Sequence, residues 1–239
     1  MSDVALDRAR ARLIVALDVP DRAAASTLAA RLAGHVGMLK IGLELFVAEG
    51  PAIVRELRER HPELEIFLDL KLHDIPNTMV GAIRSVRGLG VRFVTVHAGS
   101  GVAHLRACVD AAGDSTGILA VTVLTSQDEQ ACREAGHTRT PAELVEFRAR
   151  AAQEAGCAGL VCSGQEIEIA RMAAPGLFKV IPGIRPAGAD VGDQKRVMTP
   201  ALAIAAGATH LVIGRPIYTA DDPAAAADAI VAEIAGALG

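Results

Sequence analysis

The chain has 239 residues, with 24 Lys and Arg against 28 Asp and Glu, which gives a formal net charge of −4. Because 51% of the residues are hydrophobic and 22% are charged, the composition excludes an intrinsically disordered protein and allows one large folded domain. The acidic balance argues against a general nucleic-acid-binding protein. With no Trp and a single Tyr, the chain also offers no aromatic platform for single-stranded nucleic acid.

The cysteines and the N-terminus favour a cytoplasmic protein. The cysteines, at positions 108, 132, 157 and 162, form no Cys-x-x-Cys pair and have no histidine at zinc-site spacing, so we interpret them as thiols in a reducing compartment. The first residues, MSDVALDRARAR, lack the apolar segment of a signal peptide. No apolar run approaches the roughly 20 residues of a membrane helix, so we expect no membrane partner.

Short apolar runs alternate with amphipathic stretches along the whole chain. The runs are nearly continuous in hydrophobic residues, which is typical of parallel strands that are covered on both faces. We predict eight strands, over residues 13–17, 38–41, 65–70, 93–96, 118–124, 159–162, 179–181 and 211–213. We predict helices between them and at the end of the chain, over residues 21–32, 51–60, 78–88, 141–155, 200–206 and 223–238.

The number and order of these elements favour an α/β fold, a single (β/α)8 TIM barrel over residues 1–239. A doubly wound open sheet is the alternative. The count of eight strands favours the barrel, and no Gly-x-Gly-x-x-Gly pattern follows the first strand. Residues 183–197, GIRPAGADVGDQKRV, are rich in Gly, Pro and polar residues, and we predict a mobile loop there after the seventh strand.

Polar residues follow most of the predicted strands. In a barrel the catalytic groups lie at the carboxyl ends of the strands, so these side chains would converge on one mouth. Two carboxylates and two ammonium groups are among them. The residues are Asp18, Lys40, Asp69, Lys71, His97, Thr125, Ser126, Ser163, Arg185 and Arg215.

The third strand carries the most informative pattern, FLDLKLHD. Because side chains alternate across a strand, Asp69 and Lys71 share one face, which we expect to point into the barrel. Burying these charges is costly unless they pair, so a simple structural ion pair is one interpretation. The other is a catalytic array in which a carboxylate stabilises the ammonium group of Lys71, which then donates a proton. Asp74 lies past the strand, where an exposed or capping role is equally open.

A phosphate site is predicted after the eighth strand, where Gly214 precedes Arg215. Barrels commonly bind phosphate there through backbone N–H groups and a helix N-terminus, and Arg215 could bind the oxygens bidentately. Arg185 and Gln194 could close over the anion from the predicted loop, to which Gly183 gives freedom. The alternative is that Arg215 is an ordinary loop residue.

The histidines show no metal-binding pattern. We expect His73 and His97 near the mouth of the barrel, and His210 at the end away from catalysis. The remaining histidines are expected to face solvent; they are His35, His61, His104 and His137.

We predict no metal at the mouth of the barrel. A metal held by Asp18, Asp69 and Asp74 would lie beside Lys40 and Lys71, whose ammonium groups repel a cation.

Eight segments along the chain follow the pattern of one enzyme family, in order. The most specific is FLDLKLHDIPNT at residues 67–78. The others are LIVALDV (13–19), LKIGLELF (39–46), VTVHAGSG (94–101), AVTVLTS (120–126), VIPGIRP (180–186), GDQKRV (192–197) and LVIGRPIY (211–218). On these segments the chain resembles the orotidine 5′-phosphate decarboxylases.

This resemblance implies decarboxylation of orotidine 5′-phosphate to UMP and CO2 in de novo pyrimidine biosynthesis. It implies no metal and no organic cofactor. The chemistry would be electrostatic stabilisation of a C6 carbanion followed by protonation from Lys71. The implied catalytic residues form an alternating array, Lys40, Asp69, Lys71 and Asp74.

The resemblance also implies a homodimer with active sites shared across the interface, to which Asp74, Ile75 and Thr78 would contribute. Asp18 and Lys40 would hold the ribose hydroxyls. Thr125 or Ser126 would contact the pyrimidine, and we favour Thr125. The residues implied for the phosphate are Arg185, Gln194, Gly214 and Arg215, and Gln194 would also reach the base on loop closure.

Two other functions remain open at this point. The first is a metal-dependent decarboxylase, aldolase or epimerase that acts on keto-sugar phosphates on the same fold, which EDTA would inhibit. The second is a catalytically silent barrel that senses a phosphorylated ligand, although such a protein would be expected to have lost Lys71, Asp69 or Asp74.

Overall fold

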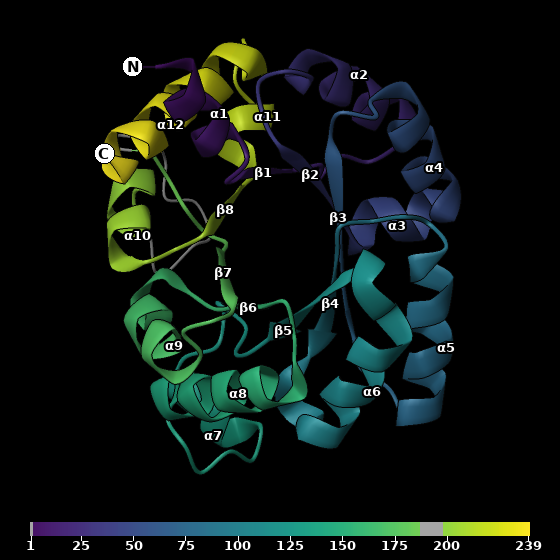
Figure 1. Ribbon diagram of the computed structural model, residues 1–239, viewed down its shortest axis with the longest axis vertical. Helices are drawn as coiled ribbons and strands as arrows, with labels where there is room; N and C mark the ends of the chain where they lie inside the picture. Colours follow the sequence, from purple (N-terminus) through teal and green to yellow (C-terminus); the bar gives the residue numbers. More distant parts are fainter. Residues whose placement is uncertain (1, 187–197) are drawn as a thin grey trace.

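Eight parallel strands close into a barrel in a computed structural model that describes residues 2–186 and 198–239 (Figure 1). Neighbouring strands pair in chain order, and β1 pairs with both β2 and β8 to close the ring. The strands are β1 (Leu13–Ala16), β2 (Met38–Gly42), β3 (Glu65–Leu72), β4 (Phe93–His97), β5 (Gly117–Val121), β6 (Gly159–Val161), β7 (Phe178–Ile181) and β8 (His210–Ile213). The predicted barrel and its eight strands are therefore confirmed.

The predicted helices all form on the outside of the barrel, with small shifts at their ends. They are α2 (Arg22–Leu32), α4 (Pro51–Arg60), α5 (Pro76–Arg87), α8 (Pro141–Ala155), α10 (Pro200–Ala206) and α12 (Pro223–Leu238). The sequence pattern did not predict α1 (Asp3–Arg10), α3 (Leu43–Glu49), α6 (Val102–Ala112), α7 (Glu129–Glu134), α9 (Ile167–Ala173) or α11 (Arg215–Tyr218). Most of these have eight residues or fewer, too short for a helical period to show.

Local signals explain where several helices begin. Proline occupies the first turn of α4, α5, α8, α10 and α12, where its missing N–H and fixed φ are tolerated. The Thr140 side chain accepts from the Glu143 N–H, and the Glu143 carboxylate accepts from the Thr140 N–H, which closes a capping box on α8. The fifth strand, predicted to reach residue 124, ends at Val121. Beyond it the Thr122 carbonyl accepts a hydrogen bond from Arg148.

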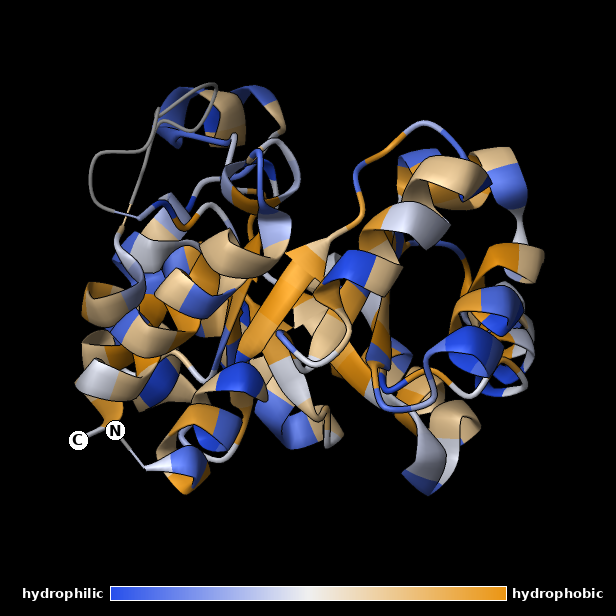
Figure 2. Ribbon diagram, turned by 90° about the horizontal axis from the view of Figure 1, so that it is seen from above, coloured by the Kyte–Doolittle hydropathy of each residue, from blue (hydrophilic) through white to orange (hydrophobic). Residues whose placement is uncertain are grey.

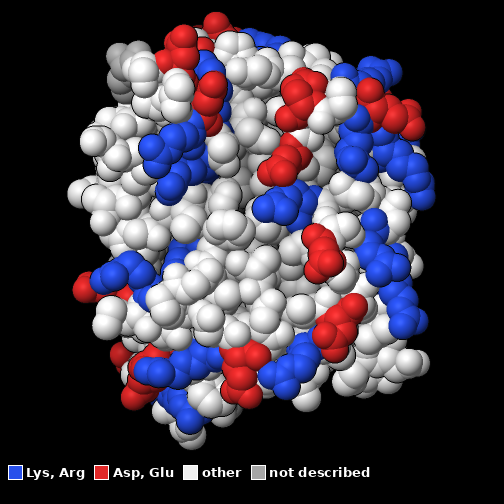
Figure 3. Space-filling model, viewed as in Figure 1, with Lys and Arg blue, Asp and Glu red and all other residues white. Residues whose placement is uncertain are grey.

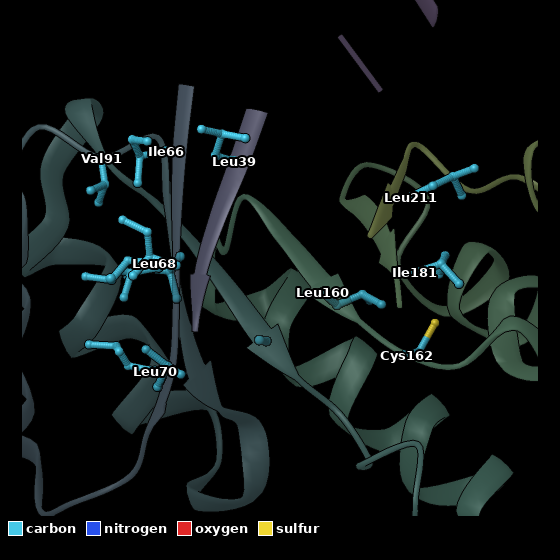
Figure 4. Close-up of a cluster of buried hydrophobic side chains, with 14 of the residues drawn as sticks. Leu39, Ile66, Leu68, Leu70, Val91, Leu160, Cys162, Ile181 and Leu211 are labelled. Atoms are coloured by element: carbon cyan, nitrogen blue, oxygen red, sulfur yellow. The ribbon is translucent and has the colours of Figure 1, made fainter. Parts of the chain in front are cut away.

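The hydrophobic core has two layers because each strand is covered on both faces. The outer layer fills the space between strands and helices, where Leu68 and Leu70 project from β3 (Figure 4). The inner layer fills the barrel and includes Ile14, Met38 and Phe67. Figure 2 shows the apolar strands at the centre of the molecule with more polar helices around them. This packing makes the barrel a solid support whose polar groups gather at its ends.

The first and last helices of the chain, α1 and α12, pack together on one side of the barrel. Helix α12 contacts α1, α10 and α2, and the two termini lie near each other (Figure 1). No helix within residues 2–186 and 198–239 is long and apolar enough to cross a membrane.

An aromatic cluster plugs the amino-terminal end of the barrel. The rings of Phe93, Phe178 and His210, each at or near the start of a strand, lie 5.1–5.9 Å apart at steep angles. Burial lowers the pKa of His210 to about 4, and the positive charges of Arg12 and Arg92 add to the effect. His210 is therefore a neutral packing residue at the end away from the predicted catalytic mouth.

We expect His210 to make folding stability depend on pH. Between about pH 6.5 and pH 4 the unfolded chain protonates this histidine and the folded chain does not, so stability falls as the pH falls through this range. His210→Asn removes the titration. The unfolding free energy of the wild type should drop by about 2 kcal/mol more than that of the variant between pH 7 and pH 4.5. Denaturant titrations at the two pH values measure this; equal drops would contradict it.

Candidate active site

A cavity of about 280 Å³ opens at the carboxyl ends of the strands, opposite the aromatic plug. It gathers residues from seven strands, all except β4, and from the loops that follow them. The predicted site residues that line it are Asp18, Lys40, Asp69, Lys71, Thr125, Ser126, Arg185, Gly214 and Arg215. In Figure 3, acidic and basic side chains lie next to one another near the middle of the face shown.

Four charged groups alternate in sign across the cavity. Lys71 Nζ lies 2.7 Å from Asp69 Oδ2, Lys40 Nζ lies 3.7 Å from the same oxygen, and Lys40 Nζ also lies 3.1 Å from Asp18 Oδ1. The Lys40 and Asp69 side chains are only 11% and 13% exposed, whereas Lys71 is 33% exposed and faces the cavity. The four charged side chains thus form a continuous series of ion pairs that lines the cavity. This differs from an isolated buried ion pair.

The strand register brings these groups together. On β2 and β3, Lys40 is the partner of Phe67 and Gly42 is the partner of Asp69, so the Lys40 backbone lies two residues below Asp69 and its long side chain extends up to the Asp69 carboxylate. The pairing of β3 with β4 then shifts between Leu68 and Leu72, and Lys71 within this bulge has a left-handed φ of +48°. Bulges re-aim side chains next to active sites, and this one lies where Lys71 enters the cavity.

Because Gly42 has no side chain, it leaves room for the Lys40 ammonium group and the Asp18 carboxylate. A Cβ at this position would lie 2.9 Å from Lys40 Nζ and 3.3 Å from Asp18 Oδ1. Any side chain would therefore push the ammonium group away from its carboxylate partner. Sequence reasoning did not single out Gly42, because a glycine next to a strand has many possible causes.

The predicted phosphate end is formed from two neighbouring loops. Gly214 and Arg215 lie at the start of α11, directly after β8, and both line the cavity. The Arg185 side chain lines it from the loop after β7, although only 8% of this residue is exposed, and its Nη1 donates to the Ile184 carbonyl at 2.9 Å. Gln194, like most of the predicted loop of residues 183–197, lies outside the described residues.

The base of that loop is held in place. Ile184 forms an isolated parallel bridge with Met198, and the Arg185 N–H donates to the Met198 carbonyl at 3.0 Å. A Cβ on Gly164 would lie 3.2 Å from the Met198 side chain, so this glycine lets Met198 pack closely. Arg185 therefore enters the cavity from a fixed point.

Three predicted residues lie on the rim and not in the cavity. Asp74, Ile75 and Thr78 are exposed, and the Asp74 carboxylate accepts from the Ile75 N–H at 2.6 Å. Ile75 is 67% exposed, and Leu43 and Val47 on α3 are 53% and 79% exposed. Because α3 follows β2 and Ile75 follows β3, these apolar side chains share the rim of the barrel mouth.

The prediction that His104 faces solvent is wrong. It is 4% exposed, and burial lowers its pKa, with the neighbouring His73 as the second cause. His104 lies on the same side of α6 as the buried Leu105 and Cys108, and its ring is 6.4 Å from that of His73. Helical spacing alone did not reveal which face of this unpredicted helix is covered.

His73 and His97 lie near the mouth, as predicted. Their ring centres are 5.3 Å apart, and His73 Nε2 lies 2.8 Å from Ser100 Oγ. Burial is the main cause that lowers the pKa of His97. Within the described residues, no group of three His, Cys, Asp or Glu side chains could hold a metal ion.

Two further polar residues at the site were missed. Thr95 is fully buried in β4 beside Asp69, and Tyr218 lines the cavity from α11. Asp18 is among the charges that affect the Tyr218 hydroxyl, whose pKa is raised mainly by burial. The alternation of β4 could have shown Thr95, since it is a polar residue on the same face as Phe93.

The fold and the site together define an (β/α)8-barrel enzyme with a charged pocket at the usual catalytic end. A sequence model of the orotidine 5′-phosphate decarboxylase / HUMPS family matches residues 11–230. The chain therefore belongs to this family.

Curated relatives and solved structures agree with this assignment. The chain is 54% identical over 228 residues to the orotidine 5′-phosphate decarboxylase of Afipia carboxidovorans, covering 95% of both chains. It is 51% identical over 230 residues to the enzyme of the same name from Halorhodospira halophila, covering 95% of this chain and 97% of that one. The crystal structure of orotidine 5′-phosphate decarboxylase from Lactobacillus acidophilus superposes with a TM-score of 0.82 at 34% identity, covering 93% of this chain and 98% of that one.

We expect Gly42→Ala to disturb the charge array. The new methyl group crowds Lys40 Nζ, so the ammonium group shifts and its contact with Asp18 weakens, at a small cost in stability because Nζ is the end of a flexible side chain. Gly236→Ala is the matched control, because Gly236 in α12 has no atom within 4 Å of the added Cβ and alanine favours helix by up to about 1 kcal/mol. Denaturant unfolding of both variants, with a crystal structure of the first, measures this. An unmoved Lys40 would count against the role of Gly42.

Proposed function

We propose that the protein decarboxylates orotidine 5′-phosphate to UMP and CO2 in de novo pyrimidine biosynthesis, without a metal or organic cofactor. The observation that carries the proposal is the ammonium group of Lys71, which faces the cavity while bonded to Asp69 at 2.7 Å. The matched curated relatives carry the name of this enzyme. Cytoplasmic location is part of the same proposal.

The reaction needs a strong local positive charge. When the bond between C6 and the carboxylate breaks, the electron pair stays on C6 in an in-plane orbital that the ring does not delocalise. Enzymes lower such barriers by roughly 8–23 kcal/mol in general, and fixed charges in a poorly hydrated site are a main source. Lys71 Nζ beside C6 stabilises the carbanion and then transfers its proton to C6. Water reprotonates the amine after the product leaves.

The neighbours of Lys71 have separate roles in this proposal. Asp69 fixes the ammonium group and lies near the carboxylate of the substrate, where like charges repel and favour loss of CO2. Asp18 and Lys40, which are paired at 3.1 Å, bind the ribose hydroxyls. Asp74 completes the array from the rim of a second subunit.

The rest of the cavity suits the two ends of a nucleotide. Thr125 lines it after β5 and is proposed to contact the pyrimidine; the neighbouring Ser126 lines it too. Arg185, Gly214 and Arg215 line the cavity from the loops after β7 and β8, and they are proposed to bind the phosphate together with Gln194. Binding energy from this remote group can organise the site for reaction at C6, so the phosphate contributes to turnover as well as to affinity.

We also propose a homodimer with shared active sites. Asp74, Ile75 and Thr78 are exposed on the rim, and an isolated subunit leaves them outside the cavity. The exposed apolar side chains of Leu43, Val47 and Ile75 on the same rim support contact with a second copy of the chain. An isologous dimer would carry each rim into the partner's site.

Ultraviolet absorbance of orotidine 5′-phosphate mixed with the purified protein in EDTA tests the activity. The spectrum should change to that of UMP with the wild type. With Lys71→Ala, turnover should fall by at least about a thousandfold, because the variant lacks both the charge and the proton, while UMP binding stays measurable. Near-wild-type kcat in the variant would refute the role of Lys71. Activity only on keto-sugar phosphates with added Mg²⁺ would replace the proposed function.

Mixing two inactive variants tests the shared site. Lys71→Ala and Asp74→Ala subunits form mixed dimers in which one of the two sites contains both native residues. After complete subunit exchange, activity should recover to about one quarter of the wild type, since half of the dimers are mixed and each has one intact site. Each variant exchanged with itself is the control. No recovery, with exchange proven by labelled subunits, would contradict a shared site.

A further inference from the structure

Thr95 faces the bulge that carries Lys71. Leu68 on β3 is the partner of Val94 on β4, and Leu72 is the partner of Val96, so three residues of β3 lie opposite Thr95 alone. The regular ladder of hydrogen bonds is interrupted there. Thr95 is fully buried, so bulk solvent does not reach its hydroxyl group.

The Thr95 hydroxyl replaces the missing ladder contacts. It accepts a hydrogen bond from the Lys71 N–H at 2.8 Å and donates one to Asp69 Oδ1 at 2.9 Å. The direction is fixed because a backbone N–H can only donate, which leaves the single hydroxyl proton for the carboxylate. Asp69 then has Oδ1 bonded to Thr95 and Oδ2 bonded to Lys71 Nζ.

This hydroxyl therefore acts on both ends of Lys71. It holds the backbone of Lys71, whose φ of +48° is unfavourable for a residue with a side chain and needs support from its surroundings. Through Asp69 it also fixes the oxygen to which the Lys71 ammonium group is bonded. A valine of the same shape at position 95 would leave the Lys71 N–H and one carboxylate oxygen without this partner.

We propose that Thr95 is a positioning residue that aligns Lys71 for proton transfer to the substrate. This inference rests on the proposed function for the reaction, but the contact to the Lys71 backbone is independent of it. It adds a residue from β4 to a site whose alternating Asp and Lys side chains come from β2, β3 and the loop after β1. Thr95 does not line the cavity, so it contacts neither the proposed substrate position nor the proton that Lys71 would transfer.

Two substitutions separate the hydroxyl from the shape of the side chain. Thr95→Val keeps the shape, and Thr95→Ser keeps the hydroxyl. Thr116→Val is the matched control, because Thr116 is a buried threonine at the opposite end of the barrel whose hydroxyl donates to the Val91 carbonyl at 3.1 Å. Thermal unfolding confirms that all three variants are folded before they are compared.

Steady-state kinetics gives the first readout. Thr95→Val should lower kcat about 10-fold to 100-fold, because misplacement of a reacting group by about 1 Å can cost about 100-fold. KM should change by less than about threefold, because the phosphate end of the cavity is untouched. Thr95→Ser should recover most of kcat, and Thr116→Val should leave kcat unchanged. Equal kcat in Thr95→Val and the wild type would overturn the proposal.

Amide hydrogen exchange at Lys71, followed by NMR, gives a readout without turnover. Exchange should be at least about tenfold faster in Thr95→Val than in Thr95→Ser or Thr116→Val, because the N–H has lost its acceptor. A kcat loss with unchanged exchange would overturn the proposal, since Thr95 would then act by another route. If the wild type itself does not decarboxylate orotidine 5′-phosphate, the proposed function fails, and the exchange rates alone decide whether Thr95 holds Lys71.

Discussion

The site depends on one carboxylate, that of Asp69, which holds two ammonium groups in the mouth of the barrel. Lys40 and Asp69 are almost buried, and removing an ion from water costs several kcal/mol. Pairing must offset that cost, and it does so by strict alternation of sign from Asp18 through Lys40 and Asp69 to Lys71. Loss of the Asp69 carboxylate would leave the ammonium groups of Lys40 and Lys71 facing each other. The same contacts therefore support both the stability of the fold and the proposed function.

The barrel supplies the rigidity that such an array requires. Its interior is filled by apolar side chains up to the level of the charges, and the opposite end is closed by Phe93, Phe178 and His210. Because the packed apolar core leaves no empty space below the charged side chains, they cannot move inward to reduce their repulsion, and the strands fix their spacing. Two irregular backbone features lie at the site, the bulge that holds Lys71 and the bridged loop base that holds Arg185.

Much of this could be predicted from the sequence, and the limits have physical causes. The eight apolar runs gave the barrel, and alternation within FLDLKLHD placed Asp69 and Lys71 on one inward face, where they lie. Strand alternation does not show a bulge, so neither the left-handed Lys71 nor the role of Thr95 was visible. Gly42 was missed because its importance lies in space left for Lys40, a property of two strands together. His104 was misplaced because its helix was not predicted.

The two lysines differ in exposure, and this difference supports separate roles for them in the proposed reaction. The Lys71 side chain is 33% exposed and faces the cavity. The Lys40 side chain is only 11% exposed and lies between two carboxylates. In the proposed reaction, a substrate carboxylate beside Asp69 would meet repulsion on one side and the ammonium group of Lys71 on the other. Loss of CO2 removes the repulsion and leaves negative charge on carbon next to the same ammonium group. Because Arg185 and Arg215 line the same cavity from the loops after β7 and β8, phosphate binding there would hold the nucleotide against this repulsion until the bond breaks.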